Sequence, residues 1–381
     1  MSTNSEKHDV PTSGFKGSDL PPYITDDPPK AFIIGGGLSG LFLGNLLEKA
    51  NIPYEIFEPA PSKRRPMDDL MKLSRPTQTF NLYTADMGTI AKLIADEVRY
   101  DRVLFARPEL YDLFLRRILR EKIHLSKKLM SLQQNHQGVM AGFSDGSTIH
   151  GGALVGADGV HSAVRHHLFN TMKEQGKLPA NDMKSMNRGY MCFLGTTNPL
   201  DPVKSPGVAD EESCNAMNIG DKSSPYTASE SNKKMLNNLR HFKIIYGTLD
   251  YIFDATNDEG ISRFFFEDML MLPSTGAGAI NGMQDAVILA NRLYDIQPTS
   301  FETIKTALSD YRDECFDNVK SQHSITYMSA RLQFDHMQNR QVLKDNVFRP
   351  QVNFLPQVPP RGTVKIIPQR PSTRRPEGRR N

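Results

Sequence analysis

Three glycines and one acidic residue near the start of the chain have the types and spacing that could bind a dinucleotide. Gly35, Gly37 and Gly40 form a GxGxxG pattern, and Glu58 follows eighteen residues later. In this pattern the first glycine permits a tight turn, the second lets the backbone approach a pyrophosphate, and the third lets a helix pack closely on a strand. A carboxylate at the position of Glu58 accepts hydrogen bonds from ribose hydroxyls and disfavours a 2′-phosphate.

The residues around these glycines predict the elements that position them. Residues 31–34 (AFII) suit a buried parallel strand, residues 41–50 carry apolar side chains at helical spacing, and residues 53–58 predict a second strand. The positive end of the helix dipole would then face the phosphates. A glycine-rich turn used for packing alone does not explain an acid at this spacing, so we expect a dinucleotide site in this βαβ unit.

Further elements are predicted downstream. Arg107 and Pro108 mark the start of a helix, and residues 127–155 predict strands and hairpins, with a turn at residues 144–147 (SDGS). Residues 153–159 (ALVGADG) predict a strand that ends in a tight turn. After a helix within residues 276–295, a long amphipathic helix is expected, with an apolar face formed by Phe301, Ile304, Leu308, Tyr311 and Cys315.

Two later motifs resemble signatures of the aromatic-hydroxylase-type flavoprotein monooxygenases. GADGVHSAVR (residues 156–165) resembles the second signature of that family, and PSTGAGAINGMQDA (residues 273–286) resembles the distal half of the third. Gly44 matches an additional glycine that the FAD-binding helices of the family often carry. The resemblance extends, with gaps, from about Ala31 to Arg361, and it is nearest to fungal members that act on aromatic, polyketide or terpenoid-type metabolites.

The resemblance implies an α/β fold with a discontinuous, Rossmann-like FAD-binding domain made of residues 31–181 and 262–345. A second, smaller sheet-bearing substrate domain would occupy residues 182–261, and C-terminal helices would follow. Residues 1–30 are polar and are expected to form a disordered leader. The Pro/Arg-rich residues 346–381 are expected to form a disordered tail.

The resemblance also assigns site residues beyond the first motif. Arg107 would contact the flavin cofactor from the start of its helix, Asp158 would sit near the pyrophosphate and ribose, and Gly159 would allow the turn. Asp285 is a cofactor contact by resemblance or simply a polar helix position. The backbone would approach the flavin ring at Pro273, Gly276 and Gly278.

The implied protein is an oxidoreductase that uses FAD, with NAD(P)H as reductant. NAD(P)H reduces the flavin, O2 adds to form a flavin hydroperoxide, and a small aromatic, polyketide or terpenoid-type substrate is hydroxylated or epoxidised. The sequence shows no convincing catalytic base. Two alternatives stay open: another FAD oxidoreductase, such as an oxidase or reductase, or a degenerate FAD-binding protein without catalysis.

The chain departs from the family at the start of the third signature. Residues 264–272 (FFFEDMLML) stand where relatives carry a Gly-Asp segment at the end of a core strand, and no Gly-Asp pair is in register. FFF or MLML are the candidates to supply that strand. Ile280 stands where many relatives place an asparagine. These departures favour the degenerate alternative, whereas the two later motifs favour the monooxygenase.

The composition argues against several other classes of protein. The net charge of +3 gives no general argument for nucleic-acid binding, and no apolar run is long enough for a membrane span or a signal peptide, so a cytoplasmic protein is expected. Cys192, Cys214 and Cys315 are far apart and fit neither a disulfide framework nor a zinc site. The basic tail leaves peripheral contact with an anionic membrane open. The sequence does not fix the oligomeric state.

Overall fold

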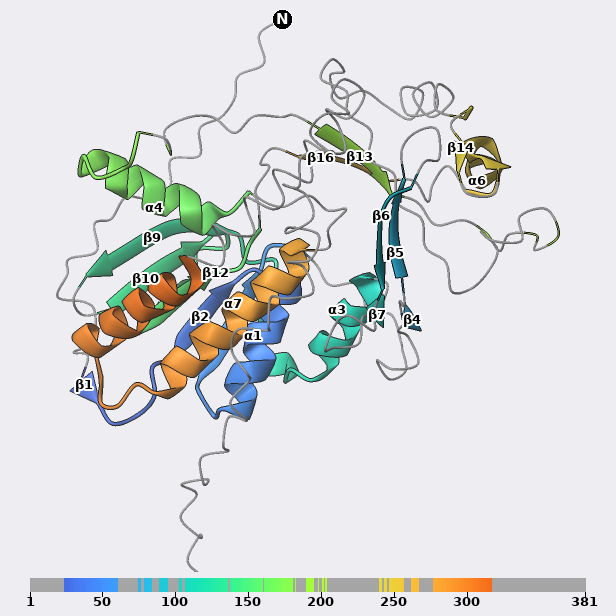
Figure 1. Ribbon diagram of the computed structural model, residues 1–381. Coiled ribbons are helices and arrows are strands. Elements are labelled where there is room, and N and C mark those ends of the chain that lie inside the picture. The colour runs from blue at the N-terminus through green and yellow to red at the C-terminus, as the bar shows by residue number, and fades with distance from the viewer. Residues whose placement is uncertain are drawn as a thin grey trace, which may run out of the picture.

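The central part of the protein is a parallel sheet covered by helices on one face and by a second sheet on the other (Figure 1). The computed structural model describes residues 24–60, 75–76, 79–83, 89–94, 103–104, 107–135, 138–159, 161–180, 182, 190–194, 198, 201, 203, 240–241, 243–244, 247–256, 262–266 and 277–316. The parallel sheet has the order β12-β2-β3-β8, formed by Ala153–Gly156, Ala31–Ile34, Tyr54–Glu58 and Ile123–Leu125.

The predicted βαβ unit is confirmed. Strand β2 is buried along its whole length, helix α1 spans Leu38–Lys49, and β2 and β3 pair in parallel. Leu41, Leu47 and Ile56 are fully buried in the core between this helix and the sheet. Gly44 faces the sheet so closely that a Cβ there would lie 2.9 Å from the Ile56 Cδ1 atom. The unit is therefore held by close helix–sheet packing.

Two further helices extend the layer that contains α1. Helix α3 (Arg107–Arg116) is tied to α1 by Asn45, whose Nδ2 donates to the Phe114 carbonyl oxygen at 3.0 Å. Helix α7 (Ala277–Tyr294) packs along α1, and the two lie side by side in Figure 1. No helix in the described ranges is both long and apolar enough to cross a membrane.

The amphipathic helix after α7 is confirmed at residues 301–316, but its predicted apolar face is only partly right. Ile304 and Cys315 are buried as expected, whereas Phe301 is 38% and Leu308 is 40% exposed. Ala307 is buried instead of Leu308. Residues 304, 307, 311 and 315 follow the helical period more closely, and a small residue fits where the helix approaches the core.

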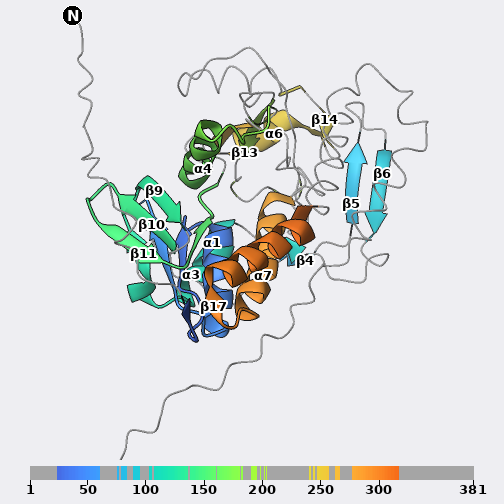
Figure 2. The same ribbon diagram turned by 90° about the vertical axis from the view of Figure 1, so that its left-hand side faces the viewer.

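The opposite face of the parallel sheet is covered by an antiparallel sheet, as Figure 2 shows. Its order is β11-β10-β9, formed by Thr148–Gly151, Gly138–Phe143 and Leu129–Asn135. The predicted turn at residues 144–147 joins β10 to β11, with Gly146 at a positive φ of 81°. Phe57 of the parallel sheet stacks on Phe143 of the antiparallel sheet at 4.8 Å, so an aromatic core joins the two sheets. Helix α4 (Ala163–Glu174) follows β12 and contacts β9.

Small sheets of two strands each stand outside this central part. The strands β5 (Thr79–Tyr83) and β6 (Thr89–Ile94) lie apart from the parallel sheet in both Figure 1 and Figure 2. Short 3-10 helix η3 (Arg120–Lys122) precedes β8. The remaining peripheral elements are β4 (Arg75–Pro76) with β7 (Val103–Leu104), β14 (Lys243–Ile244) with β15 (Gly247–Thr248), and α6 (Leu249–Asp254).

The run of three phenylalanines does not extend the parallel sheet. Phe264–Phe266 belong to β16 (Ser262–Phe266), which pairs antiparallel with β13 (Tyr190–Leu194) in a sheet of their own. The idea that FFF supplies the core strand before the third signature is therefore wrong. The MLML residues lie outside the described ranges. Because β16 pairs with β13, the sheet of the middle region also continues past residue 261.

The predicted leader is too long. Ile24–Thr25 form β1, which pairs antiparallel with β17 (Thr299–Ser300), and Pro29 is fully buried. The Thr299 hydroxyl donates to the Asp27 carbonyl oxygen at 2.7 Å. The last residues of the leader are therefore fixed to the end of the helical layer. Residues 1–23 and the tail 346–381 lie outside the described ranges.

Candidate cofactor-binding site

Three neighbouring parallel strands end at the same edge of the sheet. Ile34, the last residue of β2, is in register with Phe57 of β3 and with Gly156 of β12. Loops outside the carboxyl ends of such strands are where α/β folds bind ligands. This edge brings together six of the predicted site residues: Gly35, Gly37, Gly40, Glu58, Asp158 and Gly159.

Two of the motif glycines are required by the protein itself. Gly35 has a φ of +107°, and a Cβ there would lie 2.5 Å from the Ala157 carbonyl oxygen. A Cβ on Gly40 would lie 2.0 Å from the Gly35 carbonyl oxygen. These are the tight turn and the close helix packing that the sequence predicted. They bring α1, β2 and the end of β12 together at one point.

The second motif glycine is not required by the protein. Gly37 has an ordinary extended backbone, with φ −73° and ψ −174°, and a Cβ there would meet no atom within 4 Å. Gly278, near the start of α7, is exposed and also has open space where a Cβ would be. Neither strain nor packing accounts for glycine at these two positions. Among the described residues, nothing fills the space beside either glycine.

Glu58 is held against the glycine loop. Its Oε2 accepts from the Gly36 N–H at 2.6 Å, and its Oε1 accepts from the Ala60 N–H at 3.0 Å. Each carboxylate oxygen can accept a second hydrogen bond, so the side chain keeps acceptor capacity for a ribose. Burial, and then the charge of Glu58, raise the pKa of Tyr111 on α3. Tyr111 is therefore a neighbour of the site that the sequence pattern did not single out.

Asp158 has one bonded and one unpaired oxygen. Its Oδ2 accepts from the backbone N–H of Ala163 at 2.7 Å and of Val164 at 3.3 Å, so it caps the start of α4. Its Oδ1 is buried and has no hydrogen-bond partner among the described residues. Leaving a buried acceptor unpaired is costly, so a donor from outside the described residues is expected there. Gly159, with φ +78°, makes the following turn and leaves open space beside it.

The structure does not describe the side chain or the position of three predicted site residues. Arg107 is the first residue of α3, which packs on α1, but the position of its side chain is not described. Pro273 and Gly276 lie outside the described ranges. Their roles at the flavin ring therefore stay predictions.

Asp285 takes the polar helix position rather than a place at the strand ends. Its carboxyl group forms a hydrogen bond with the Cys315 thiol of the helix at residues 301–316. Burial raises the pKa of Asp285, and burial together with the Asp285 charge raises the pKa of Cys315 to about 12. Tyr311 joins the same cluster, and burial raises its pKa as well. These groups connect α7 with the helix at residues 301–316.

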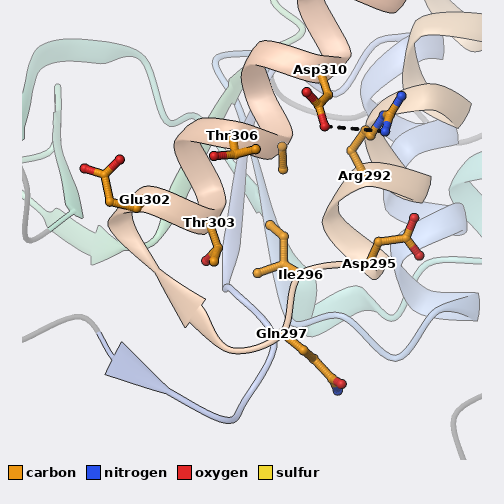
Figure 3. A pocket seen from close by; sticks show the side chains of 9 residues that line it. Arg292, Asp295, Ile296, Gln297, Glu302, Thr303, Thr306 and Asp310 are labelled. Atoms are coloured by element: carbon orange, nitrogen blue, oxygen red, sulfur yellow. Dashed lines mark ion pairs between the residues drawn. The ribbon is translucent and has the colours of Figure 1, made fainter.

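A pocket of about 300 Å³ lies at the other end of α7, where Figure 3 shows it between that helix and the next. Its polar side chains bind one another: the Arg292 guanidinium pairs with Asp310 at 3.6 Å and with Glu314 at 2.7 Å. Helix α7 has 18 residues and is therefore about 25 Å long, which separates this pocket from the glycine loop. The pocket is not part of the candidate site.

The residues at the strand ends fit a dinucleotide such as FAD. The backbone of Gly37 and the start of α1 present N–H groups to a pyrophosphate, whereas the Gly35 and Gly36 N–H groups are bonded to the Phe57 carbonyl and to Glu58. Glu58 and Asp158 present acceptors to hydroxyl groups. The space over Gly37 and Gly278 is open to a ligand.

Comparison with known proteins gives FAD-dependent monooxygenases as relatives. No protein-family model matches the chain. FAD-dependent monooxygenase ausM of Penicillium brasilianum is 22% identical over 375 residues, which cover 80% of this chain and 79% of ausM. FAD-dependent monooxygenase nvfK of Aspergillus novofumigatus is 28% identical over 214 residues, which cover 49% of this chain and only 44% of nvfK.

Solved structures show the fold. A salicylate hydroxylase substrate complex matches with a TM-score of 0.64 and 16% identity, over 91% of this chain and all of that one. HpxO of Klebsiella pneumoniae, complexed with FAD and uric acid, matches with a TM-score of 0.60 and 15% identity, over 86% of this chain and 96% of that one. In sequence the chain is similar to FAD-dependent monooxygenases, and in fold it is similar to solved flavin hydroxylases such as salicylate hydroxylase.

Proposed function

We propose that the chain binds FAD at the carboxyl edge of its parallel sheet and uses it as a monooxygenase. NAD(P)H would reduce the flavin, and one oxygen atom of O2 would be transferred to a small organic substrate by hydroxylation or epoxidation. The observation that carries the proposal is the open space over Gly37, next to two carboxylates that retain acceptor capacity.

Each residue at the edge has a role in this proposal. The backbone N–H groups of Gly37 and the start of α1 bind the pyrophosphate, and Gly37 lets it approach. Glu58 accepts hydrogen bonds from the ribose, and the Asp158 Oδ1 accepts a further hydroxyl. Gly278 lets the first turn of α7 approach the flavin. Three residues complete the site on the strength of the family resemblance: Arg107, Pro273 and Gly276.

The flavin supplies the difficult chemistry when bound, by taking hydride from NAD(P)H and activating O2. The chain binds and orients the flavin and keeps water from the reacting atoms. We propose that residues 182–266, including the β13–β16 sheet, form the substrate domain, and that residues 31–181 and the helices from α7 onward form the FAD-binding domain. An aromatic, polyketide or terpenoid-type substrate follows from the same resemblance. A cytoplasmic location is proposed because the three scattered cysteines fit a reducing compartment.

A flavoprotein without catalysis is the second candidate. It is favoured by one observation: Phe264–Phe266 belong to the β13–β16 sheet, whereas no Gly-Asp pair stands in register in residues 264–272, directly before Pro273. Loss of one hydrogen bond to the flavin would weaken binding about ten- to a hundredfold without abolishing it.

Turnover of the purified protein separates the two candidates. We expect a visible band at about 450 nm from bound flavin. We also expect NAD(P)H oxidation that is stimulated by aromatic or terpenoid test compounds, with transfer of one atom from isotope-labelled O2 to the product. Bound flavin with NAD(P)H oxidation that yields only hydrogen peroxide across a broad compound set would favour the second candidate.

A further inference from the structure

Helices α1 and α7 are in close contact where Ser39 meets Gly282. A Cβ on Gly282 would lie 2.3 Å from the Ser39 Oγ atom and 3.4 Å from the Ser39 Cβ atom. The first distance is too short for any real contact, and the second is ordinary van der Waals contact. Residue 282 therefore has no room for a side chain while the Ser39 hydroxyl stays in its present place.

This contact lies close to the start of both helices. Ser39 is the second residue of α1, two residues after Gly37, whereas Gly282 is the sixth residue of α7. Both helices begin at the same end in Figure 1. Gly278 lies one turn before Gly282 on the same face of α7, about 6 Å nearer its start. The first turn of α7 therefore extends past the contact, toward the glycine loop.

The two parts of α7 on either side of the contact differ in burial. After it, Ala286, Ala290 and Leu293 are buried in the core with α1. Before it, Gly278 and Ala279 are exposed, and Ile280 is 59% exposed. Added bulk at the contact is relieved either by rotation of the Ser39 hydroxyl or by movement of α7, and the buried part of α7 cannot move without opening the core. The exposed first turn would move away from the glycine loop instead.

We propose that Ser39 and Gly282 are positioning residues that set the distance between the first turn of α7 and the glycine loop. That distance fixes the width of the FAD site between the open positions at Gly37 and Gly278. The inference rests on the proposed function, since it assigns a role toward bound FAD. It predicts that a methyl group at residue 282 acts on flavin binding through the Ser39 hydroxyl.

The test is a double-variant cycle on the full chain, with FAD binding followed by quenching of flavin fluorescence. We expect Gly282→Ala to raise the FAD dissociation constant about ten- to a hundredfold, in the range expected for an overpacked contact. The flavin absorbance maxima should shift as the environment of the ring changes. Ser39→Ala alone should change the dissociation constant little. Ser39→Ala in the Gly282→Ala background should restore both readouts, because the remaining Cβ–Cβ distance is tolerable.

A matched control exists in the antiparallel sheet. A Cβ on Gly142 of β10 would lie 2.5 Å from the Ser131 Oγ atom, which repeats the same glycine–serine geometry far from the strand ends. Gly142→Ala should lower the melting temperature and leave the FAD dissociation constant unchanged. Ser131→Ala in that background should recover the melting temperature. The control separates a general packing effect from an effect on the cofactor.

The outcomes distinguish this inference from the function on which it rests. If the well-folded wild-type chain binds no FAD, the proposed function fails and the inference fails with it. If wild type binds FAD and Gly282→Ala binds it equally well, the inference alone is overturned. If Gly282→Ala is weakened and Ser39→Ala does not restore binding, the hydroxyl–glycine contact is not the cause. Restoration by Ser39→Ala supports the proposal.

Discussion

The polar groups at the strand ends and those near the end of helix α7 differ in whether they have hydrogen-bond or ion-pair partners. Near its start, the Asp158 Oδ1 is buried without a partner among the described residues, and the space over Gly37 and Gly278 is open. Near its end, Arg292 already pairs with two acidic side chains around a pocket of about 300 Å³. In that pocket the Arg292 guanidinium is already paired within the protein, whereas the strand ends have bonding capacity left over. Unused bonding capacity is the better guide to a cofactor site here.

Filling the open space at the strand ends should have the largest effect. We expect Gly37→Val to raise the FAD dissociation constant more than a hundredfold, because the side chain takes the space of the pyrophosphate. The melting temperature of the flavin-free protein should hardly change, since no protein atom lies within 4 Å of a Cβ there. Fluorescence titration and thermal unfolding measure the two quantities. A large fall in melting temperature would show that Gly37 is a packing glycine.

A side chain at Gly40 should instead lower the stability of the flavin-free protein. Gly40→Ala places a Cβ 2.0 Å from the Gly35 carbonyl oxygen, a backbone atom that cannot rotate away. Overpacking of this kind costs about 1–3 kcal/mol or more of folding free energy. Denaturant unfolding of the flavin-free protein should show this loss, with Gly37→Ala as the matched control. Equal stability of the two variants would remove the distinction between these glycines.

The unpaired oxygen of Asp158 gives a smaller, more selective prediction. Asn at this position can still cap α4 with its carbonyl oxygen, because Asn and Asp are both good capping residues. The unpaired acceptor, however, becomes an NH2 donor. We expect Asp158→Asn to weaken FAD binding about tenfold with little change in melting temperature. Asp158→Ala, which loses the cap as well, should lower the FAD affinity and the melting temperature. Unchanged FAD binding in the Asn and Ala variants would exclude Asp158 from the site.

Breaking the pairs at the far end of α7 should have the smallest effect. Arg292 and its acidic partners are partly exposed, so solvent screens their attraction. Arg292→Ala should cost about 1 kcal/mol or less of stability and leave FAD binding unchanged. Denaturant unfolding and fluorescence titration check this. A clear loss of flavin binding would show that the Arg292 pairs are part of the FAD site or support it.

Local patterns made the βαβ unit and its glycines predictable from the sequence. The turn at Gly35, the close packing of Gly40 and the position of Glu58 all depend on residues near one another in the chain. The Asp-Gly pair did not predict that one Asp158 oxygen caps α4 while the other lacks a partner among the described residues. That arrangement depends on where α4 begins. Ser162, which caps Arg165 N–H at 3.0 Å, was the available signal for that helix start.

Long-range pairing set the limits of the sequence predictions. Phe264–Phe266 have the composition of a core strand, but their partner β13 lies about seventy residues earlier in the chain, and composition does not select a partner. The pairing of β1 with β17 joins segments still farther apart, so the leader looked unstructured. Similarly, Ala307 rather than Leu308 is buried because the core offers little room there.

Titration of the purified full chain with FAD tests the central claim most directly, with Gly37→Val measured beside the wild type. The account predicts saturable binding and a band at about 450 nm for the wild type, and neither for Gly37→Val at equal melting temperature. A well-folded wild-type protein that does not bind FAD, or a Gly37→Val variant that binds it as tightly as wild type, would contradict the assignment of the strand ends as the flavin site.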